Sequence, residues 1–212
     1  MHVHVLVKWA NKHRSLILIA AYSKFYNNYD GLSTFQLNKN NAKVVIEDVI
    51  AKNNEFEGMY LTGTGITVNN ANIKNNLNGL VIGGVAENNE ITLAGDITVT
   101  NNKYGFDTTA RAQGTVYVTG DFNLNRNEEV GLEARSPDLT IAVGGSYSGK
   151  SGKSGSGSLT ACDNGQYDIV NDGGTGGPST FEGSDYTCET TDGPGIPKCE
   201  PCHPGCSESS QD

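Results

Sequence analysis

The chain is poor in basic residues and in aromatic residues, and it has no long apolar run. Lys and Arg number 15 against 24 Asp and Glu, which gives a net charge of -9 and a pI near 4.9. Nucleic acids and anionic membranes are bound by basic surfaces, so this balance argues against both partners. No stretch approaches the roughly 20 apolar residues of a membrane-spanning helix, which predicts no membrane span. Calcium, cationic surfaces and neutral sugars stay open as ligands.

Hydrophobic residues are also scarce for a chain of 212 residues. They make up 36% of the sequence and aromatic residues 8%, too little to fill a thick globular core. In their place the chain has 27 glycines and many asparagines, which separate short apolar runs. This pattern is typical of short strands joined by turns, and it predicts an all-β fold.

One sequence pattern recurs along the chain. It consists of two asparagines, two or three free positions, a glycine and a large apolar residue, with Arg126 replacing the first asparagine in the last copy. The repeat glycines follow one another at steps of 27, 21, 26 and 26 residues. Periods of this size predict a solenoid or another repeat architecture. These glycines are Gly31, Gly58, Gly79, Gly105 and Gly131.

Apolar residues alternate on both sides of each glycine, which indicates strands with one buried face. About three short strands in 21 to 27 residues fit one coil of a parallel β-helix, in which equivalent residues of successive coils stack about 4.8 Å apart. We expect about six coils with right-handed winding. A leucine-rich repeat would need a helical segment, and a propeller blade would need about 40 residues. The expected inner column is Leu32, Met59, Leu80, Phe106 and Leu132.

The paired asparagines are predicted to be structural. Asparagine tolerates the left-handed backbone of a sharp turn, and a column of stacked side-chain amides can satisfy its own hydrogen bonds. The glycine is expected where the backbone needs conformational freedom or close approach. A sixth, degraded copy with Asp163 and Asn164 in the asparagine places and Asp168 in the glycine place would close the column. The predicted ladder is Asn28, Asn54, Asn76, Asn102 and Asn127.

The two ends lie outside the repeat. Residues 1–21 are expected to be either a targeting segment or a first strand, since the run from Ser15 to Ala21 follows basic residues and ends in small ones. Residues 22–175 are expected to form the β-helix. Residues 176–212 are expected to form a cap and a Cys-rich tail.

Four of the five cysteines lie in this tail, which suits an oxidising compartment and predicts an extracellular or cell-surface protein. Cys162 and Cys188 are the preferred disulfide pair, tying the cap to the last coil. The Cys199-x-x-Cys202 spacing beside His203 also allows a zinc site, although disulfides are favoured there. Because five is odd, one thiol is free or bonded between chains. The disulfide candidates are Cys162, Cys188, Cys199, Cys202 and Cys206.

Residues 144–151 match the phosphate-binding pattern G-x-x-x-x-G-K-[ST]. Such a loop must open a helix whose first amides hold the phosphates. The Gly and Ser residues that follow do not favour a helix, so we interpret the match as low-complexity sequence.

Among many carboxylates, Asp107 and Glu133 stand at the same place after the repeat glycine, and Arg135 follows two residues later. They are expected to lie on one outward strip. Acids in such an arrangement flank a glycosidic bond in hydrolases, or hold calcium beside a base in other enzymes. Solvated outward positions are the simpler interpretation. The repeat contains no histidine to act as acid or base.

Residues 22–172, with the Asn-Asn-x-x-Gly motif and its flanking apolar alternation, resemble right-handed parallel β-helix repeat proteins of the pectate-lyase-like superfamily. The resemblance implies a β-helix that acts on or binds polysaccharide. The catalytic strings of its enzymes are missing, among them Asn-Thr-Asp and Gly-His-Gly, so no catalytic residue is carried over. We expect a non-catalytic surface protein with a structural, adhesion or weak glycan-binding role and no cofactor, whose partner is polysaccharide or another surface protein. The alternative is a polysaccharide lyase or hydrolase, or a remnant of one. Contact with carbohydrate or an ion is predicted for Asp107, Glu133 and Arg135.

Overall fold

The computed structural model describes residues 5–10, 15–34, 43–84, 89–146, 154–173 and 177–202. Within these ranges every regular element is a strand, and almost every strand pair is parallel. The first sheet has the order β1-β2-β5-β7-β9-β11-β14-β19, and four shorter strands extend it where the coil bends. Its main strands are β1 (Val5–Ala10), β2 (Ser15–Ala21), β5 (Lys43–Lys52), β7 (Thr64–Lys74), β9 (Asn89–Thr100), β11 (Gly114–Val118), β14 (Leu139–Val143) and β19 (Thr180–Gly183).

The shorter strands of the first sheet are β3 (Lys24–Tyr26), β12 (Asp121–Asn123), β17 (Ser158–Thr160) and β20 (Tyr186–Thr187). The second sheet comprises β4 (Leu32–Ser33), β6 (Glu57–Leu61), β8 (Asn78–Ile82), β10 (Tyr104–Thr108), β13 (Val130–Ala134), β18 (Tyr167–Asn171) and β21 (Thr191–Asp192). A small antiparallel hairpin joins β15 (Gly145–Ser146) to β16 (Ser154–Gly155).

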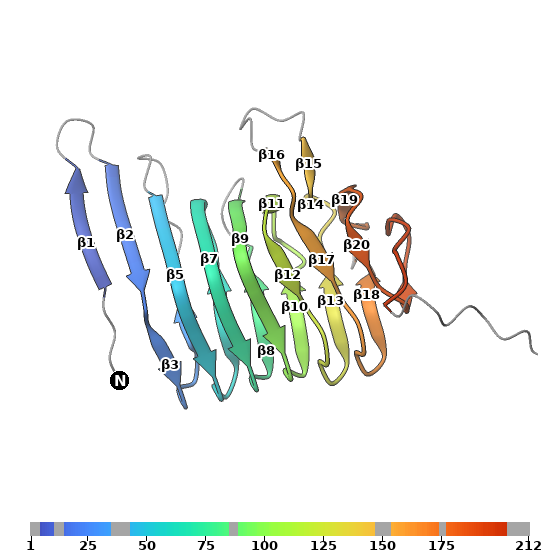
Figure 1. The fold of residues 1–212 in the computed structure, drawn as a ribbon, viewed down its shortest axis with the longest axis horizontal. Helices are drawn as coiled ribbons and strands as arrows, with labels where there is room; N and C mark the ends of the chain where they lie inside the picture. Colours follow the sequence, from blue (N-terminus) through green and yellow to red (C-terminus); the bar gives the residue numbers. More distant parts are fainter. Residues whose placement is uncertain are drawn as a thin grey trace, which may run out of the picture.

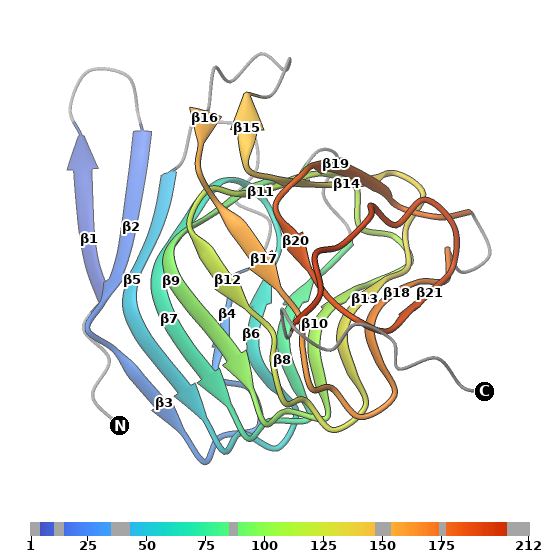
Figure 2. The ribbon, with the colours of Figure 1, turned by 45° about the vertical axis from the view of Figure 1, so that its right-hand side comes forward.

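The chain winds as a solenoid of about six coils, which confirms the predicted fold class. In Figure 1 the first sheet runs downward in front, the second sheet runs upward behind it, and the coils advance from left to right, so the winding is right-handed. Figure 2 shows the stacked coils obliquely, with the two sheets facing each other. The stretch from Ser15 to Ala21 forms β2, which pairs in parallel with β5.

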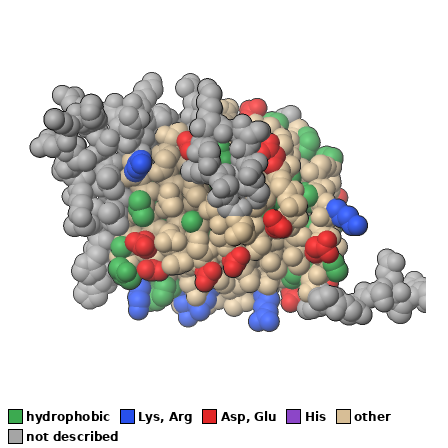
Figure 3. Space-filling view, turned by 45° about the horizontal axis from the view of Figure 1, so that its top comes forward, with side chains coloured by type: hydrophobic (Ala, Val, Ile, Leu, Met, Phe, Trp, Pro, Cys, Tyr) green, Lys and Arg blue, Asp and Glu red, His purple; other side chains and the backbone are tan. Residues whose placement is uncertain are grey.

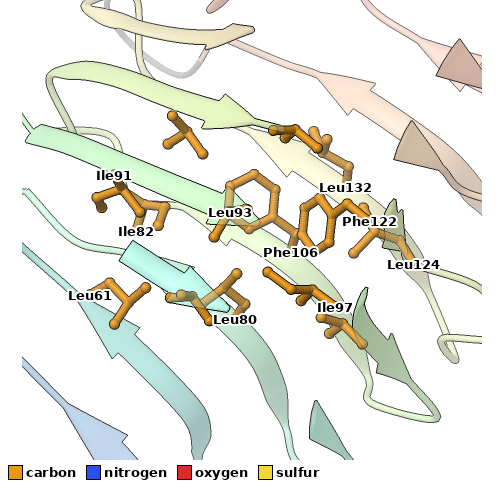
Figure 4. Packing of buried hydrophobic residues seen from close by; sticks show 14 of the residues in the cluster. Leu61, Leu80, Ile82, Ile91, Leu93, Ile97, Phe106, Phe122, Leu124 and Leu132 are labelled. Atoms are coloured by element: carbon orange, nitrogen blue, oxygen red, sulfur yellow. The ribbon is translucent and has the colours of Figure 1, made fainter. Parts of the chain in front are cut away.

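The predicted inner columns are in register. Leu32 pairs with Met59, Met59 with Leu80, Leu80 with Phe106 and Phe106 with Leu132. Facing them from the first sheet are buried residues such as Ile97 and Phe122, and Figure 4 shows these side chains meeting between the two sheets. Because each coil contributes only a few apolar side chains, the modest hydrophobic content of the chain suffices for this narrow core.

The two asparagines of each repeat have different roles. The first has a left-handed backbone, with φ of 57° at Asn53 and 54° at Asn101. Arg126, which stands in the same place in the fifth copy, has a φ of 58°. The second forms the predicted amide ladder. The Oδ1 atom of Asn102 accepts hydrogen bonds from the backbone nitrogen and the Nδ2 of Asn76, both at 3.0 Å. The same pair of bonds repeats from Asn28 to Asn54, from Asn54 to Asn76, from Asn102 to Asn127 and from Asn127 to Asn164.

The repeat glycine is required by close approach. A Cβ atom at Gly79 would lie 2.6 Å from the carbonyl oxygen of Gly105 and 2.8 Å from the Nδ2 of Asn102, closer than any side chain tolerates. Gly105 faces Gly131 and Asn127 in the same way. The glycine therefore admits the ladder amide of the following coil.

Asn164 joins the column as predicted, and Asp168, in the glycine place of the sixth copy, ends it one step further on. Its Oδ1 accepts the Nδ2 of Asn164 at 2.9 Å, and its Oδ2 accepts the backbone nitrogens of Glu189 at 2.9 Å and Thr190 at 3.0 Å. A carboxylate accepts hydrogen bonds and donates none. It can therefore end a column in which each asparagine donates to the residue of the next coil.

Two disulfides close the C-terminal end, and they correct the preferred pairing of Cys162 with Cys188. Cys162 is joined to Cys202 and Cys188 to Cys199, with Cα atoms 5.9 and 5.3 Å apart. Thr160 pairs with Thr187, so Cys188 lies opposite Ala161 and is one residue out of register with Cys162. Both cysteines of the Cys199-x-x-Cys202 motif are thus in disulfides, which also overturns the zinc interpretation. Cys206, His203 and residues 147–151 of the phosphate-loop match lie outside the described residues.

We predict that Asn102→Leu destabilises the chain by at least about 3 kcal/mol, since each buried group left without a partner costs about 1 to 3 kcal/mol. Asn102 is fully buried, and its Nδ2 also donates to the carbonyl oxygens of Ile73 and Thr100. Urea unfolding followed by circular dichroism measures the change.

The neighbouring Asn101→Gly variant is the control. Asn101 is exposed and has a positive φ that glycine adopts freely, so its free energy of unfolding should stay within about 0.5 kcal/mol of the wild type. Equal effects of the two substitutions would contradict the separate roles.

Candidate functional site

The outward face of the second sheet carries the polar cluster that the sequence predicts. Since Met59 and Leu61 point into the core, Tyr60 between them points outward. The strand register places the residues equivalent to Tyr60 in one outward column. That column is Tyr60, Val81, Asp107, Glu133 and Val170.

Arg135 binds both acids of this column. Its Nη2 atom donates to the Oδ2 of Asp107 at 3.2 Å and to the Oε2 of Glu133 at 2.6 Å. Its backbone nitrogen donates to the Oγ1 of the buried Thr108 at 2.8 Å, which fixes the start of the side chain. The structure thus brings together the three residues that the sequence places on one strip. Their contact with carbohydrate or an ion stays a prediction.

Three buried atoms of this cluster have no hydrogen-bond partner among the described residues. They are the Oδ1 of Asp107, the Oγ1 of Thr109 and the Nε of Arg135. Asp107 as a whole is only 7% exposed. A buried polar atom without a partner costs about 1 to 3 kcal/mol, so such atoms are rare in folded proteins and call for an explanation.

Burial also changes the protonation of two acids on this face. Burial raises the pKa of Asp107 to about 7, and Glu133 adds to the rise, while Arg135 and the backbone of Thr108 oppose it. Burial raises the pKa of Glu57 to about 7 as well, with further contributions from Asp30 and Asp107. Both carboxyl groups therefore hold a proton to higher pH than a solvent-exposed acid does.

Glu57 and Tyr60 are site residues that sequence reasoning did not select. Glu57 directly precedes the repeat glycine Gly58. It is the extra residue of the second copy, which has three free positions where most copies have two, and it pairs with Asn78 in the next coil. The Tyr60 ring lies across Gly83, where a Cβ atom would collide with it. The signal in the sequence was the register itself, because Tyr60 occupies the same place after its glycine as Asp107 and Glu133.

Two further tyrosines belong to the second sheet. Tyr104 and Tyr167 both pair with Val130, so they lie in one register column, three residues before that of Asp107. Tyr167 is 37% exposed, and Tyr104 lies beside the Lys103–Glu129 ion pair. The second sheet therefore combines tyrosine rings with hydrogen-bonding groups.

The opposite sheet has a separate polar hollow of about 320 Å³ on β5, β7 and β9, lined in part by Asp48, Asn70, Asn72 and Asp96. Acidic side chains are spread across the middle of this side of the molecule, and Lys and Arg gather along its lower rim in Figure 3. Asn70 is engaged with its neighbours, since its Nδ2 donates to Asp48 at 3.0 Å and its Oδ1 accepts from the backbone of Asp96 at 2.9 Å. The hollow is open and lies along a structural turn, so the Asp107 cluster is the better candidate.

In the described part of the chain, no group of three or more His, Cys, Asp or Glu side chains is arranged to hold a metal ion. Likewise, those ranges contain no helix long and apolar enough to cross a membrane.

Comparisons with known proteins do not place the chain in a family. It matches no family model, no curated protein and no solved structure. The likeness to pectate-lyase-like proteins therefore stays a resemblance of the repeat, whereas the parallel β-helix is shown by the structure.

We predict that the wild-type chain loses stability as pH rises from about 4 to about 7. Asp107 has a raised folded-state pKa, so in this window the folded state binds more protons than the unfolded state, and deprotonation favours unfolding. Asp107→Asn should flatten this slope. Urea midpoints measured at several pH values test it, with Asp96→Asn on the exposed face of the other sheet as control. A slope unchanged by Asp107→Asn would contradict the assignment.

Proposed function

We propose that the chain is an extracellular or cell-surface β-helix protein that binds polysaccharide without cleaving it, through the outward face around Asp107, Glu133 and Arg135. The observation that carries the proposal is the buried pair of unpartnered atoms on this face, one an acceptor on Asp107 and one a donor on Arg135.

A hydroxyl group both donates and accepts hydrogen bonds, which matches the acceptor on Asp107, the donor on Arg135 and the hydroxyl of Thr109. Because these atoms are buried, a ligand reaches them only when the surrounding side chains move aside. Sugars present several hydroxyl groups in fixed geometry. A bound sugar would therefore satisfy the groups that the described residues leave unpaired.

The tyrosines support the same ligand class. Tyr60, Tyr104 and Tyr167 offer rings with an apolar body and a polar tip, which suit the mixed apolar and polar surface of a sugar. Because the coils repeat about every 4.8 Å, the face presents these groups in a row along the solenoid axis, as a polymer requires.

The two acids are not arranged as a catalytic pair. Hydrolysis needs one carboxyl group on each side of the glycosidic bond. Asp107 and Glu133 instead bond to the same nitrogen of Arg135 and lie in neighbouring coils. Both are engaged in holding the guanidinium group.

Polysaccharide cleavage is a second candidate, and one observation favours it. A pKa of about 7 at Asp107 would suit a general acid at neutral pH. Cleavage and binding without cleavage give different products in the same experiment.

An extracellular or surface location is supported by the Cys162–Cys202 and Cys188–Cys199 disulfides, which form and persist in oxidising environments. A binding solenoid held at a surface would also serve adhesion or a structural role.

The experiment is a titration of the purified chain with a panel of soluble polysaccharides by calorimetry, with reducing ends and unsaturated products measured after long incubation. We expect binding and no new products. Thr109→Val removes a buried hydroxyl that has no partner among the described residues, so it should leave the thermal midpoint unchanged or higher and weaken binding about tenfold, the equivalent of one hydrogen bond.

Thr98→Val, an equivalent change on the opposite sheet, is the matched control and should bind as the wild type does. New reducing ends would favour the cleavage alternative. Wild-type binding by Thr109→Val, or loss of binding in the control, would contradict this placement of the site.

A further inference from the structure

We infer that the polysaccharide bound on this face is neutral, and that acidic polysaccharides such as polyuronates are rejected; the inference rests on the proposed function and concerns the same site. The charges that surround Asp107 decide between a neutral and a charged polymer. The unpartnered atoms alone leave that choice open.

Carboxyl groups outnumber the cation around the site. Arg135 interacts electrostatically with Asp107, Glu133 and Asp172, and Glu57 interacts with Asp30 and Asp107. The five carboxyl groups therefore belong to one connected set with a single guanidinium group. Even with Glu57 and Asp107 both protonated, the three remaining acids outnumber Arg135.

These acids come from several coils, although β8 between β6 and β10 contributes none. Asp30 immediately precedes Gly31, whose backbone nitrogen donates to the carbonyl oxygen of Glu57 at 2.8 Å. Glu57 lies on β6, Asp107 on β10 and Glu133 on β13, so the negative charge extends along the solenoid axis. A polymer lying along that axis would meet it over several sugar residues.

An anionic polymer would bring its carboxylates against this row, and like charges repel most strongly where burial lowers the local permittivity. Arg135 gives little compensation, because its Nη2 is already bonded to both acids. A neutral polymer carries no such penalty.

A cationic polymer fits less well than a neutral one. Ammonium groups would be attracted to the acids, but they have no acceptor to offer the buried Nε of Arg135. They would also bring positive charge next to the guanidinium group. A neutral hydroxyl satisfies donor and acceptor alike.

The acidic row sets the length of the contact. From β6, which holds Glu57, to β13, which holds Glu133, there are three strand spacings, or roughly 14 Å along the solenoid axis. The site therefore takes a short stretch of a longer chain rather than a single sugar.

The experiment compares three probes at pH 8: a neutral β-glucan, polygalacturonate and quaternised chitosan oligomers, which stay cationic at this pH, each titrated into the full chain by calorimetry at low and high salt. We expect the neutral polymer to bind about tenfold or more tightly than polygalacturonate at low salt, with the gap narrowing at high salt as screening weakens the repulsion. Neutral binding itself should change little with salt.

Glu57→Gln removes one charge of the row without touching the Arg135 bonds. It should strengthen polygalacturonate binding several-fold at low salt, and by a larger factor than it changes β-glucan binding. The matched control is Glu55→Gln, an equivalent change at an exposed neighbour, which should change neither.

The outcomes separate the two claims. If none of the three probes binds, the proposed function fails. If polygalacturonate or the quaternised chitosan binds more tightly than the neutral polymer, binding stands and the inferred ligand class is wrong. If Glu57→Gln and Glu55→Gln behave alike, the acidic row does not set the selectivity.

Discussion

The amide ladder is the interaction on which the rest of the structure depends. Each ladder asparagine accepts the backbone and side-chain nitrogens of the coil before it, so every turn of the solenoid is bonded to the next through one buried column. The repeat glycine follows from the ladder, because a Cβ atom at Gly79 would occupy the space of the Asn102 amide. The left-handed first asparagine follows too, since it turns the chain so that its neighbour points inward. The narrow apolar core then stacks in a register that the column fixes.

The same register creates the polar face. Once the glycines are aligned, the residue two positions later falls in one outward column, and Asp107 and Glu133 become neighbours although 26 residues separate them. Arg135 then reaches both acids at the cost of leaving its own Nε and one Asp107 oxygen without partners among the described residues. Arrangements that store unmet hydrogen bonds in this way are characteristic of binding sites. The face is therefore where we place recognition of a polysaccharide.

Much of the fold could be predicted from the sequence because each coil of a solenoid needs the same residue types at the same places. The inner columns and the ladder as far as Asn164 follow from one motif that recurs several times, whereas its end at Asp168 was not predicted. The disulfides could not be read, because pairing depends on a one-residue offset between Cys162 and Cys188 in a region without the repeat. The grouping of Asp107, Glu133 and Arg135 was predictable from register. The register also pointed to Tyr60, but the part played by Glu57 was not predictable, since it depends on burial.

Native-state hydrogen exchange of the ladder amides tests the central claim most directly. If the column bonds all the coils into one cooperative unit, the backbone amides of Asn54, Asn76 and Asn102, each bonded to the side chain of the next coil, should exchange only through global unfolding. Their exchange free energies should then equal one another and the free energy of unfolding from urea titration. Exchange free energies that fall well below that value, or that differ from coil to coil, would show that the coils open independently and would contradict the ladder as the constraint on which the structure depends.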